Sequence, residues 1–319
     1  MNNFNVSTCE NLLIKIFVIG YKKRGESIVV LFLDKSANTV IYSIVIDSFK
    51  YCNINKTIEI LNSYKIESID ILCWSHPDWD HTWGIDELLK VYCDDTTKII
   101  LPFALSDPAF NSYKHNKRDK EYLEYVFSLN KISQQACISS SVAPNEFSRV
   151  DSFTIMDVAD KISVTIDTLS PHSTYVNYLI TTKGKIDKNQ LSTVLFVKVN
   201  SYKFVFCSDI ENDSIRFLNK AAFSNPIFIK IPHHGSQTSD DILSIMDTSL
   251  SNTISCSTIY HRHKLPNSII MNRYSDCCAQ VDCTGSNGTD LFGIVEYSFD
   301  LFEHQTCDVI YHGHAVNHS

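Results

Sequence analysis

One stretch of ten residues constrains this chain more than any other: residues 75–84 read Ser-His-Pro-Asp-Trp-Asp-His-Thr-Trp-Gly. It holds four potential metal ligands, which are His76, Asp78, Asp80 and His81. Imidazole and carboxylate groups together suit zinc, manganese or iron. Since alternate residues of an extended loop face the same way, the pattern predicts that His76, Asp78 and Asp80 project together. The stretch directly follows an apolar run, residues 69–74, so it predicts a metal site at the end of a strand.

The composition is typical of a globular protein with a large core. Apolar residues make up 44% of the 319 positions and charged residues 20%. The 11 cysteines are odd in number and show no CxxC spacing, which indicates reduced thiols. No apolar run reaches the roughly 18–20 residues of a membrane span, and the N-terminus lacks the features of a signal peptide. We therefore expect a cytoplasmic protein that does not enter a membrane.

The net charge of −8 disfavours work on long duplex DNA, because the chain as a whole would repel a phosphate backbone. It favours a small phosphodiester, a short nucleic-acid strand, or a substrate delivered by a protein partner. Residues 114–120 form the one basic cluster, Lys-His-Asn-Lys-Arg-Asp-Lys. Two interpretations remain for this cluster, a solvated loop or helix start and a track for phosphate groups.

Short apolar runs rich in Val, Ile and Phe predict strands at residues 12–18, 27–33, 40–46, 69–74, 98–101, 162–169, 193–199, 203–207, 227–231, 253–257 and 291–297. Helical spacing predicts helices at residues 56–63, 85–92, 119–132, 213–222, 240–246 and 267–275. Strands mixed with helices in both halves predict sheets covered by helices, an α/β (α+β) arrangement. We expect one domain, residues 1–319, in which 105–160 form an insertion or lid, 133–149 are a loop and 300–319 are a polar tail.

Two further groups of metal-ligand residues also follow predicted strands. Asp209 comes directly after the strand 203–207, and His233 and His234 come after the strand 227–231. In α/β architectures, strand ends on one edge of a sheet converge on a common space where ligands bind. The sequence therefore predicts that all three segments meet at one site.

These residues resemble the metallo-β-lactamase-fold hydrolases. The resemblance rests on His-x-Asp-x-Asp-His at 76–81, Ser-Asp at 208–209 and Pro-His-His-Gly-Ser at 232–236, and spans about residues 10–300. Weaker marks are Gly25-Glu26-Ser27 and Val45-Ile46-Asp47-Ser48. The most similar variant is the hydrolase domain of the competence DNA-uptake channel protein. The resemblance implies a four-layer αβ/βα sandwich with a two-metal site along one edge.

By position, the resemblance implies two divalent ions that share Asp209 as a bridging ligand. One ion would be held by His76 and Asp78. The other would be held by Asp80, His81 and His234. His234 is chosen over His233 because the family's ligand directly precedes the glycine, and His233 would then touch substrate or orient a ligand.

The chain departs from the family pattern at three positions. Asp78 stands where a second histidine is usual, Asn189 stands in place of the third-motif histidine, and Ser208 replaces a glycine. Asn189 is at best a weak neutral ligand. The departures imply that the first ion binds weakly, and the carboxylate Asp78 favours manganese over zinc there.

Two ions about 3.5–4 Å apart would activate a bridging water and stabilise an in-line displacement. This chemistry suits phosphodiester hydrolysis and also the opening of a lactone or thioester. Asp80 could accept the proton of the water as well as bind metal. Protonation of the leaving group needs another residue, for which His263 is the candidate and His261 an equal alternative. Lys264 or Arg262 is placed to hold a phosphate oxygen.

The leading hypothesis is thus a metal-dependent phosphodiesterase or nuclease-like hydrolase. One alternative is a hydrolase of a non-phosphate ester such as a lactone. Another is a catalytically impaired sensor or partner module, which the departures at Asn189 and Asp78 suggest. Its place in a bacterial defence system rests on analogy. The oligomeric state stays open.

Overall fold

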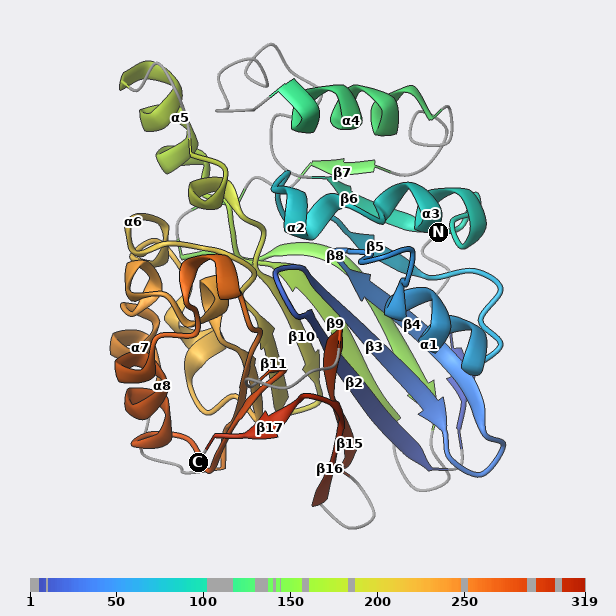
Figure 1. The fold of residues 1–319 in the computed structure, drawn as a ribbon. Helices are drawn as coiled ribbons and strands as arrows, with labels where there is room; N and C mark the ends of the chain where they lie inside the picture. The colour runs from blue at the N-terminus through green and yellow to red at the C-terminus, as the bar shows by residue number, and fades with distance from the viewer. Residues whose placement is uncertain are drawn as a thin grey trace.

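The computed structural model describes residues 6–9, 11–101, 117–129, 137–139, 142–143, 145–156, 161–182, 187–247, 252–285, 291–301 and 306–318. The strands of these residues form two mixed sheets that pack face to face, with helices on both outer sides (Figure 1). Helices α6, α7 and α8 cover one sheet, and α1 and α3 lie against the other (Figure 1). This is the four-layer αβ/βα sandwich that the sequence predicts, so the predicted fold class is confirmed.

One sheet, called the N-terminal sheet below, has the strand order β16-β15-β2-β3-β4-β5-β6-β7 among the described residues. Its strands are β2 Leu12–Tyr21, β3 Glu26–Asp34, β4 Thr39–Ile46, β5 Ile71–Cys73, β6 Lys98–Leu101, β7 Cys137–Ser139, β15 Phe292–Asp300 and β16 Thr306–Gly313. β4, β5, β6 and β7 pair in parallel, so their carboxyl ends share one edge.

The other sheet, called the C-terminal sheet, has the order β1-β8-β9-β10-β11-β12-β13-β14-β17 in the same part of the chain. Its strands are β1 Val6–Thr8, β8 Ser148–Met156, β9 Lys161–Thr168, β10 Leu195–Val199, β11 Tyr202–Phe206, β12 Phe228–Lys230, β13 Ile254–Ser257, β14 Gln280–Cys283 and β17 Val316–Asn317. β11 to β14 are parallel, which again brings their carboxyl ends to one edge.

The helices are short and connect the strands. The α-helices are α1 Lys56–Ser63, α2 Trp79–Thr82, α3 Ile85–Val91, α4 Lys117–Ser128, α5 Ser173–Thr182, α6 Asn212–Ile215, α7 Ile242–Ile245 and α8 Ser268–Ser275. The 3₁₀ turns are η2 Asn189–Leu191, η3 Lys220–Phe223, η4 Pro232–Gly235, η5 Gln237–Ser239 and η6 His261–His263. None of the described helices has the length and apolar character needed to cross a membrane.

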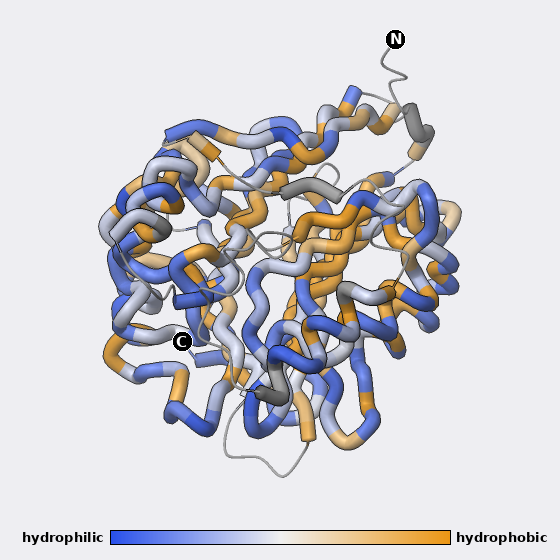
Figure 2. The backbone as a smooth tube through the Cα atoms, turned by 90° about the horizontal axis from the view of Figure 1, so that it is seen from above, coloured by the Kyte–Doolittle hydropathy of each residue, from blue (hydrophilic) through white to orange (hydrophobic). Residues whose placement is uncertain are grey.

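The core lies between the sheets and continues under the helices. On β2 and β3, alternate side chains such as Ile16 and Val30 face the opposite sheet, whereas Phe17 and Leu31 face the helix layer. Because both faces of these strands are buried, their sequences are mostly apolar and do not alternate regularly with polar residues. Figure 2 shows apolar strand segments gathered in the interior and hydrophilic segments around the periphery.

Several predicted elements differ from the structure. The predicted helix 213–222 is two short pieces, α6 and η3, and the predicted loop 133–149 contains β7 and the start of β8. Strand β14 and helix α5 fall where no element was predicted. Residues 102–116 and 130–136 of the predicted lid lie outside the described residues, and these include residues 114–116 of the basic cluster. The rest of the cluster, residues 117–120, begins helix α4.

The predicted tail is wrong for residues 306–318. They form β16, which pairs antiparallel with β15 over its whole length, and β17, which pairs with β14. β16 is an edge strand with one face in solvent, where partly buried Cys307 and Val309 alternate with exposed residues. A half-exposed strand has no continuous apolar run to reveal it.

Candidate metal centre

The three predicted segments meet at the carboxylate of Asp209. Its Oδ2 atom lies 3.8 Å from Nε2 of His76 and 3.4 Å from Nε2 of His81, both in the segment after β5. It also lies 3.5 Å from Nε2 of His234, in η4 after β12. Asp209 itself follows β11, so the site is built at the carboxyl ends of parallel strands from both sheets.

The predicted alternation within residues 76–81 ends at Asp78. Asp78 has extended backbone angles and precedes α2, whose first turn carries Asp80 and His81. Oδ2 of Asp80 lies 3.4 Å from Nε2 of His234. Asp80 therefore reaches the site from helix α2 and not through the extended alternation that the sequence predicts.

The ligands instead fall into two groups around Asp209. We call Asp80, His81, Asp209 and His234 the His81–His234 set. We call His76 and Asp78, whose Nε2 and Oδ2 atoms are 3.8 Å apart, the His76–Asp78 pair. His76, His81, Asp209 and His234 are buried, whereas the Asp78 side chain is 32% exposed.

A hydrogen bond on the Nδ1 side fixes each of the three histidine rings. The partner of His81 is Asp47 at 2.7 Å, that of His234 is Thr258 at 2.7 Å, and that of His76 is Ser75 at 3.0 Å. Thr258 donates its own hydroxyl proton to Glu26, so Nδ1 of His234 must be the donor to Thr258. Nε2 of that ring then carries the lone pair that a metal requires.

The nitrogen-to-oxygen separations in the His81–His234 set are close to those around a tetrahedral ion. Ligand atoms about 2.0–2.2 Å from zinc lie about 3.3–3.6 Å from one another in a tetrahedron. Nitrogen-to-oxygen separations in the set are 3.4, 3.4, 3.5 and 3.9 Å. Nε2 of His81, Nε2 of His234 and Oδ1 of Asp209 are buried atoms without a hydrogen bond in the described part of the chain, and so is Nε2 of His76 in the neighbouring pair. Burying such atoms is costly unless a ligand completes them.

Two buried carboxylates, Asp47 and Glu26, lie on the Nδ1 side of His81 and His234. Asp47 accepts hydrogen bonds from the backbone and hydroxyl of Ser75 at 2.7 and 2.6 Å besides contacting His81. Glu26 has ligand-type atoms within 4.8 Å of those of His81, Asp209 and His234. Its Oε2, however, faces Lys230 at 2.8 Å and the Nδ1 side of His234. We therefore treat Glu26 as a residue that orients His234.

Strained backbone collects at these strand ends. Asp47, Ser208, His233 and His234 have φ angles of 58°, 47°, 46° and 51°, a region that favours glycine. Such conformations persist only where surrounding contacts enforce them, and they concentrate at functional sites. The left-handed conformation of Ser208 also explains why a glycine is usual at this position in the family that the sequence resembles.

The charges of the set are strongly coupled. Burial disfavours charge on Asp209, yet His234 and His81 hold the pKa of its carboxyl well below the ordinary value. Burial likewise disfavours the imidazolium of His81, but Asp209 and Asp47 raise its pKa well above the ordinary value. The pKa of His76 is lowered, first by burial and then by His81. The negative potential around Asp209 thus attracts positive charge to the His81–His234 set.

The remaining predicted residues of the loops lie next to the site. Asn189 has its Nδ2 atom 3.2 Å from Nε2 of His233, so its amide meets His233 and not His76. Nδ1 of His233 lies 3.0 Å from the hydroxyl of Thr238 and 3.4 Å from Glu211. His233 is thus tied to neighbouring loops, and its backbone donates a hydrogen bond to the carbonyl of Ser208, next to Asp209, at 2.9 Å.

The two candidates for the general acid, His261 and His263, lie on the exposed turn η6. The ring of Tyr260 stacks on His234 on one side and on His263 on the other, with centroids 4.9 and 5.0 Å apart. Tyr260 therefore separates His263 from the ligands. His261 and Lys264 are exposed on the same turn. The structure places all three beside the candidate centre without contact to its ligand atoms.

Sequence reasoning missed several residues that shape the site. Glu26 and Asp47 were noted within motifs but given no role. Lys230 carried a usable signal, because a lysine inside the apolar run 227–231 must be paired if it is buried. Lys188 gave no such signal, yet its Nζ atom lies 2.6 Å from Oδ1 of Asp78.

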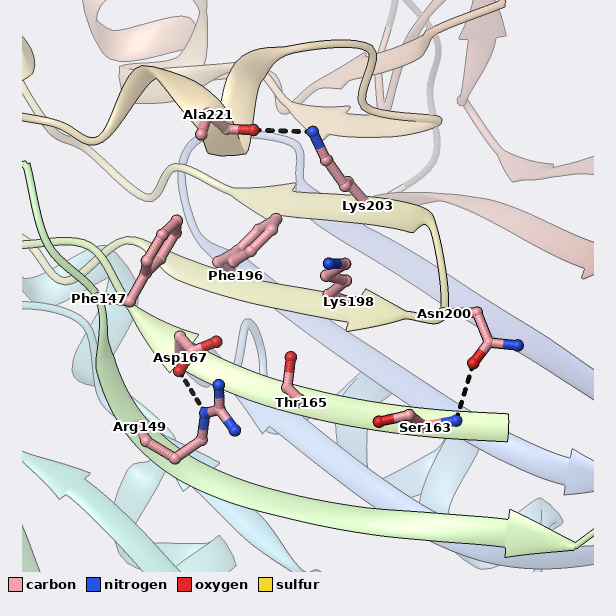
Figure 3. Close-up of a pocket in the computed structure, with 10 residues that line it drawn as sticks. All are labelled: Phe147, Arg149, Ser163, Thr165, Asp167, Phe196, Lys198, Asn200, Lys203 and Ala221. Carbon is pink, nitrogen blue, oxygen red and sulfur yellow. Dashed lines mark hydrogen bonds and ion pairs between the residues drawn. The ribbon is translucent and has the colours of Figure 1, made fainter. Parts of the chain in front are cut away.

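The pocket drawn in Figure 3, of about 510 Å³, lies elsewhere, on the outer face of the C-terminal sheet. Phe147 and Phe196 stack at one end of it, Arg149 pairs with Asp167, and Lys203 bonds the carbonyl of Ala221 (Figure 3). The ten residues that line it include none of the predicted site residues.

No protein-family model matches the sequence, and no curated protein matches it. Among solved structures, similarity extends to a diphosphatase of the PhnP family, with a TM-score of 0.40, 12% identity, and coverage of 82% of this chain and 91% of that chain. Zn²⁺-bound PqqB from Methylobacterium extorquens has a TM-score of 0.34, 10% identity, and coverage of 67% and 71%. The short form of human tRNase Z has a TM-score of 0.39, 10% identity, and coverage of 83% and 89%. These similarities are too low to transfer a residue role or an activity.

Proposed function

We propose that this chain is a metal-dependent hydrolase that cleaves phosphodiester bonds. One observation carries the proposal: the buried Nε2 atoms of His81 and His234 converge on Asp209, while their Nδ1 atoms are held from behind. Nitrogen and oxygen ligands of this kind suit zinc or manganese. The motif resemblance to metallo-β-lactamase-fold hydrolases, the competence hydrolase domain included, supports the reaction class.

A bound divalent cation would supply a hydroxide nucleophile at neutral pH and Lewis-acid stabilisation of a phosphoryl oxygen. Within the chain, we assign to Asp80 the orientation of the attacking water and the acceptance of its proton. Its carboxylate stays ionised despite burial, because His234 and His81 lower its pKa. Asp47 and Thr258 keep the rings of His81 and His234 in one orientation, so no reorganisation is needed during the reaction.

The basic side chains on and next to the exposed turn η6 favour an anionic substrate. It presents His261, Arg262, His263 and Lys264 to solvent directly beside Tyr260 and the candidate ligands. We assign protonation of the leaving group to His263, with His261 as the alternative, and contact with a phosphate oxygen to Lys264 or Arg262. The net charge of −8 favours a small phosphodiester or a short strand as substrate. We place this activity in the cytoplasm, in one domain of residues 1–319.

Cleavage of bis(p-nitrophenyl) phosphate by metal-loaded protein tests this function. Asp80→Ala and His81→Ala should abolish turnover, whereas His312→Ala, a change on the edge strand β16, should leave it intact. Unchanged turnover in either site variant would overturn the mechanism. Turnover of a lactone with none of the phosphodiester would replace the substrate class and keep the metal centre.

A second candidate is a metal-binding module without turnover. It is favoured by one observation, the ion pair between Asp78 and Lys188, which alters the place where the resemblance implies a first ion. This candidate predicts metal binding by the wild-type chain, loss of metal in His81→Ala, and no hydrolysis of either ester.

A further inference from the structure

The site contains a lysine that neither the motifs nor the resemblance assigns. Nζ of Lys188 lies 2.6 Å from Oδ1 of Asp78 and donates a hydrogen bond to the carbonyl of Pro77 at 3.3 Å. The Lys188 side chain is only 7% exposed. A buried ammonium group is stable only where anions and carbonyls replace its water, so this contact is part of the built site.

The segment that carries Lys188 is anchored to the rest of the site. Lys188 directly precedes η2, and the following backbone is tied to the metal-motif loop by a hydrogen bond from Thr193 to the carbonyl of Ser75 at 3.0 Å. Asn189 contacts His233, and the carbonyl of Gln190 accepts a hydrogen bond from Ser214 at 2.6 Å. The ammonium group is therefore held in place beside Asp78.

Asp78 and His76 are the side chains that the resemblance assigns to the first ion, together with Asp209. A divalent cation there would have to share the carboxylate of Asp78 with the ammonium of Lys188, and like charges at such short range repel strongly. Asn189 adds no negative charge to offset the repulsion and faces His233 instead. The residues present thus do not fit a second cation.

The His81–His234 set shows the opposite arrangement. Its buried lysine, Lys230, lies behind His234 and pairs with Glu26, so no ammonium group touches a candidate ligand carboxylate of that set among the described contacts. In the described part of the chain, the ion-pair partners of Nε2 of His81 and Nε2 of His234 are the carboxylates of Asp80 and Asp209.

We propose that this chain holds one divalent cation, in the His81–His234 set, and that the ammonium group of Lys188 occupies the place of a second cation beside Asp78. The inference rests on the proposed metal centre and refines it. Asp78 is then a partner of Lys188 and not a metal ligand. The site positions one ion and one fixed ammonium group on opposite sides of Asp209.

The test counts ions per chain. Full-length protein loaded with Zn²⁺ or Mn²⁺ and freed of excess metal is measured by elemental analysis and native mass spectrometry. The wild type should hold one ion and Lys188→Ala two. Lys188→Arg, which keeps the charge, should hold one, as should Lys203→Ala, whose lysine bonds carbonyl groups on the far face of the C-terminal sheet. Adding Asp78→Asn to Lys188→Ala should return the count to one.

Location is settled with two further variants. His81→Ala should hold no ion, and His76→Ala should still hold one. Two ions in the wild type, one ion in folded Lys188→Ala, or an ion lost in His76→Ala and kept in His81→Ala would overturn the inference while leaving a metal hydrolase intact. No ion and no phosphodiester turnover in the wild type would instead overturn the proposed function. If Lys188→Ala does not fold, the counts for the wild type and Lys188→Arg still decide.

Discussion

The His81–His234 set and the His76–Asp78 pair share Asp209, yet they are built differently. In the set, buried carboxylate and hydroxyl groups orient both histidines, and the nearby cation Lys230 stands behind the rings. In the pair, Lys188 contacts the candidate ligand Asp78 itself. The difference teaches that residues of metal-ligand type do not by themselves make a metal site. The position of the nearest fixed cation decides whether an ion can enter.

The largest expected difference between the two regions is in the free energy of unfolding when their lysines, Lys230 and Lys188, are replaced. Lys230→Met leaves Glu26 charged and unpaired in the interior, so it should lower the free energy of unfolding by about 3–5 kcal/mol. Lys188→Met should cost less, about 1.5–3 kcal/mol, because Asp78 is partly exposed to water. Urea unfolding at neutral pH measures both. Adding Glu26→Gln to Lys230→Met should recover part of the loss, and full additivity of the two changes would contradict the pairing.

The next effect concerns the histidines. His81→Ala should weaken zinc binding by more than about 100-fold, which exceeds the usual cost of losing an outer partner, and His76→Ala by less than about tenfold. Competition with a chromogenic chelator gives both affinities. Equal losses would erase the distinction between the set and the pair, and a larger loss in His76→Ala would reverse it.

A smaller effect on zinc affinity is expected for residues that contact the histidine ligands and not the metal itself. Asp47→Asn places an amide against Nδ1 of His81 and should weaken zinc binding by about 10–100-fold. Ser75→Ala removes the hydroxyl against Nδ1 of His76 and should change zinc affinity far less. The same chelator competition applies, with circular dichroism as the control for folding. A stronger effect of Ser75→Ala would assign the ion to His76.

The smallest effect is expected on the free energy of unfolding, at an ion pair outside the site. Glu296 on β15 contacts Lys15 on β2 at 2.6 Å and His312 on β16 at 3.0 Å. Burial opposes its charge, but Lys15 and His312 lower its pKa below the ordinary value of 4.5. The pair therefore adds stability that is complete above that value and is lost as pH falls through the lower folded pKa.

Glu296→Gln should reduce the free energy of unfolding by about 1 kcal/mol at neutral pH. The difference from wild type should vanish in acid, and zinc affinity should not change. Urea unfolding across the acidic range checks this. A difference that persists at the lowest pH would show that packing, and not the ion pair, carries the effect.

Much of the fold was readable from the sequence because its strands are buried on both faces. Helix α1 has the predicted bounds, and β6 does as well, since apolar spacing alone defined them. The edge strand β16 was missed because only one of its faces packs. The predicted helix 213–222 was wrong because apolar spacing does not reveal the turn at residues 216–219, which separates α6 from η3.

The sequence predicted that the candidate ligands would lie together, but it did not predict the residues that support them. His76, His81, Asp209 and His234 follow strands whose ends converge, and the structure brings all four together. Which carboxylate backs which ring depends on contacts between residues far apart in the chain, such as Thr258 with Glu26. The pairing of Lys188 with Asp78 is of the same kind, since the two residues are 110 positions apart in sequence.

Anomalous X-ray diffraction from crystals of the zinc-loaded protein tests the central claim most directly. It should show a single peak per chain, bound by His81, His234, Asp209 and Asp80, with the ammonium group of Lys188 still on Asp78. A second peak between His76 and Asp78, or a peak there alone, would contradict the account.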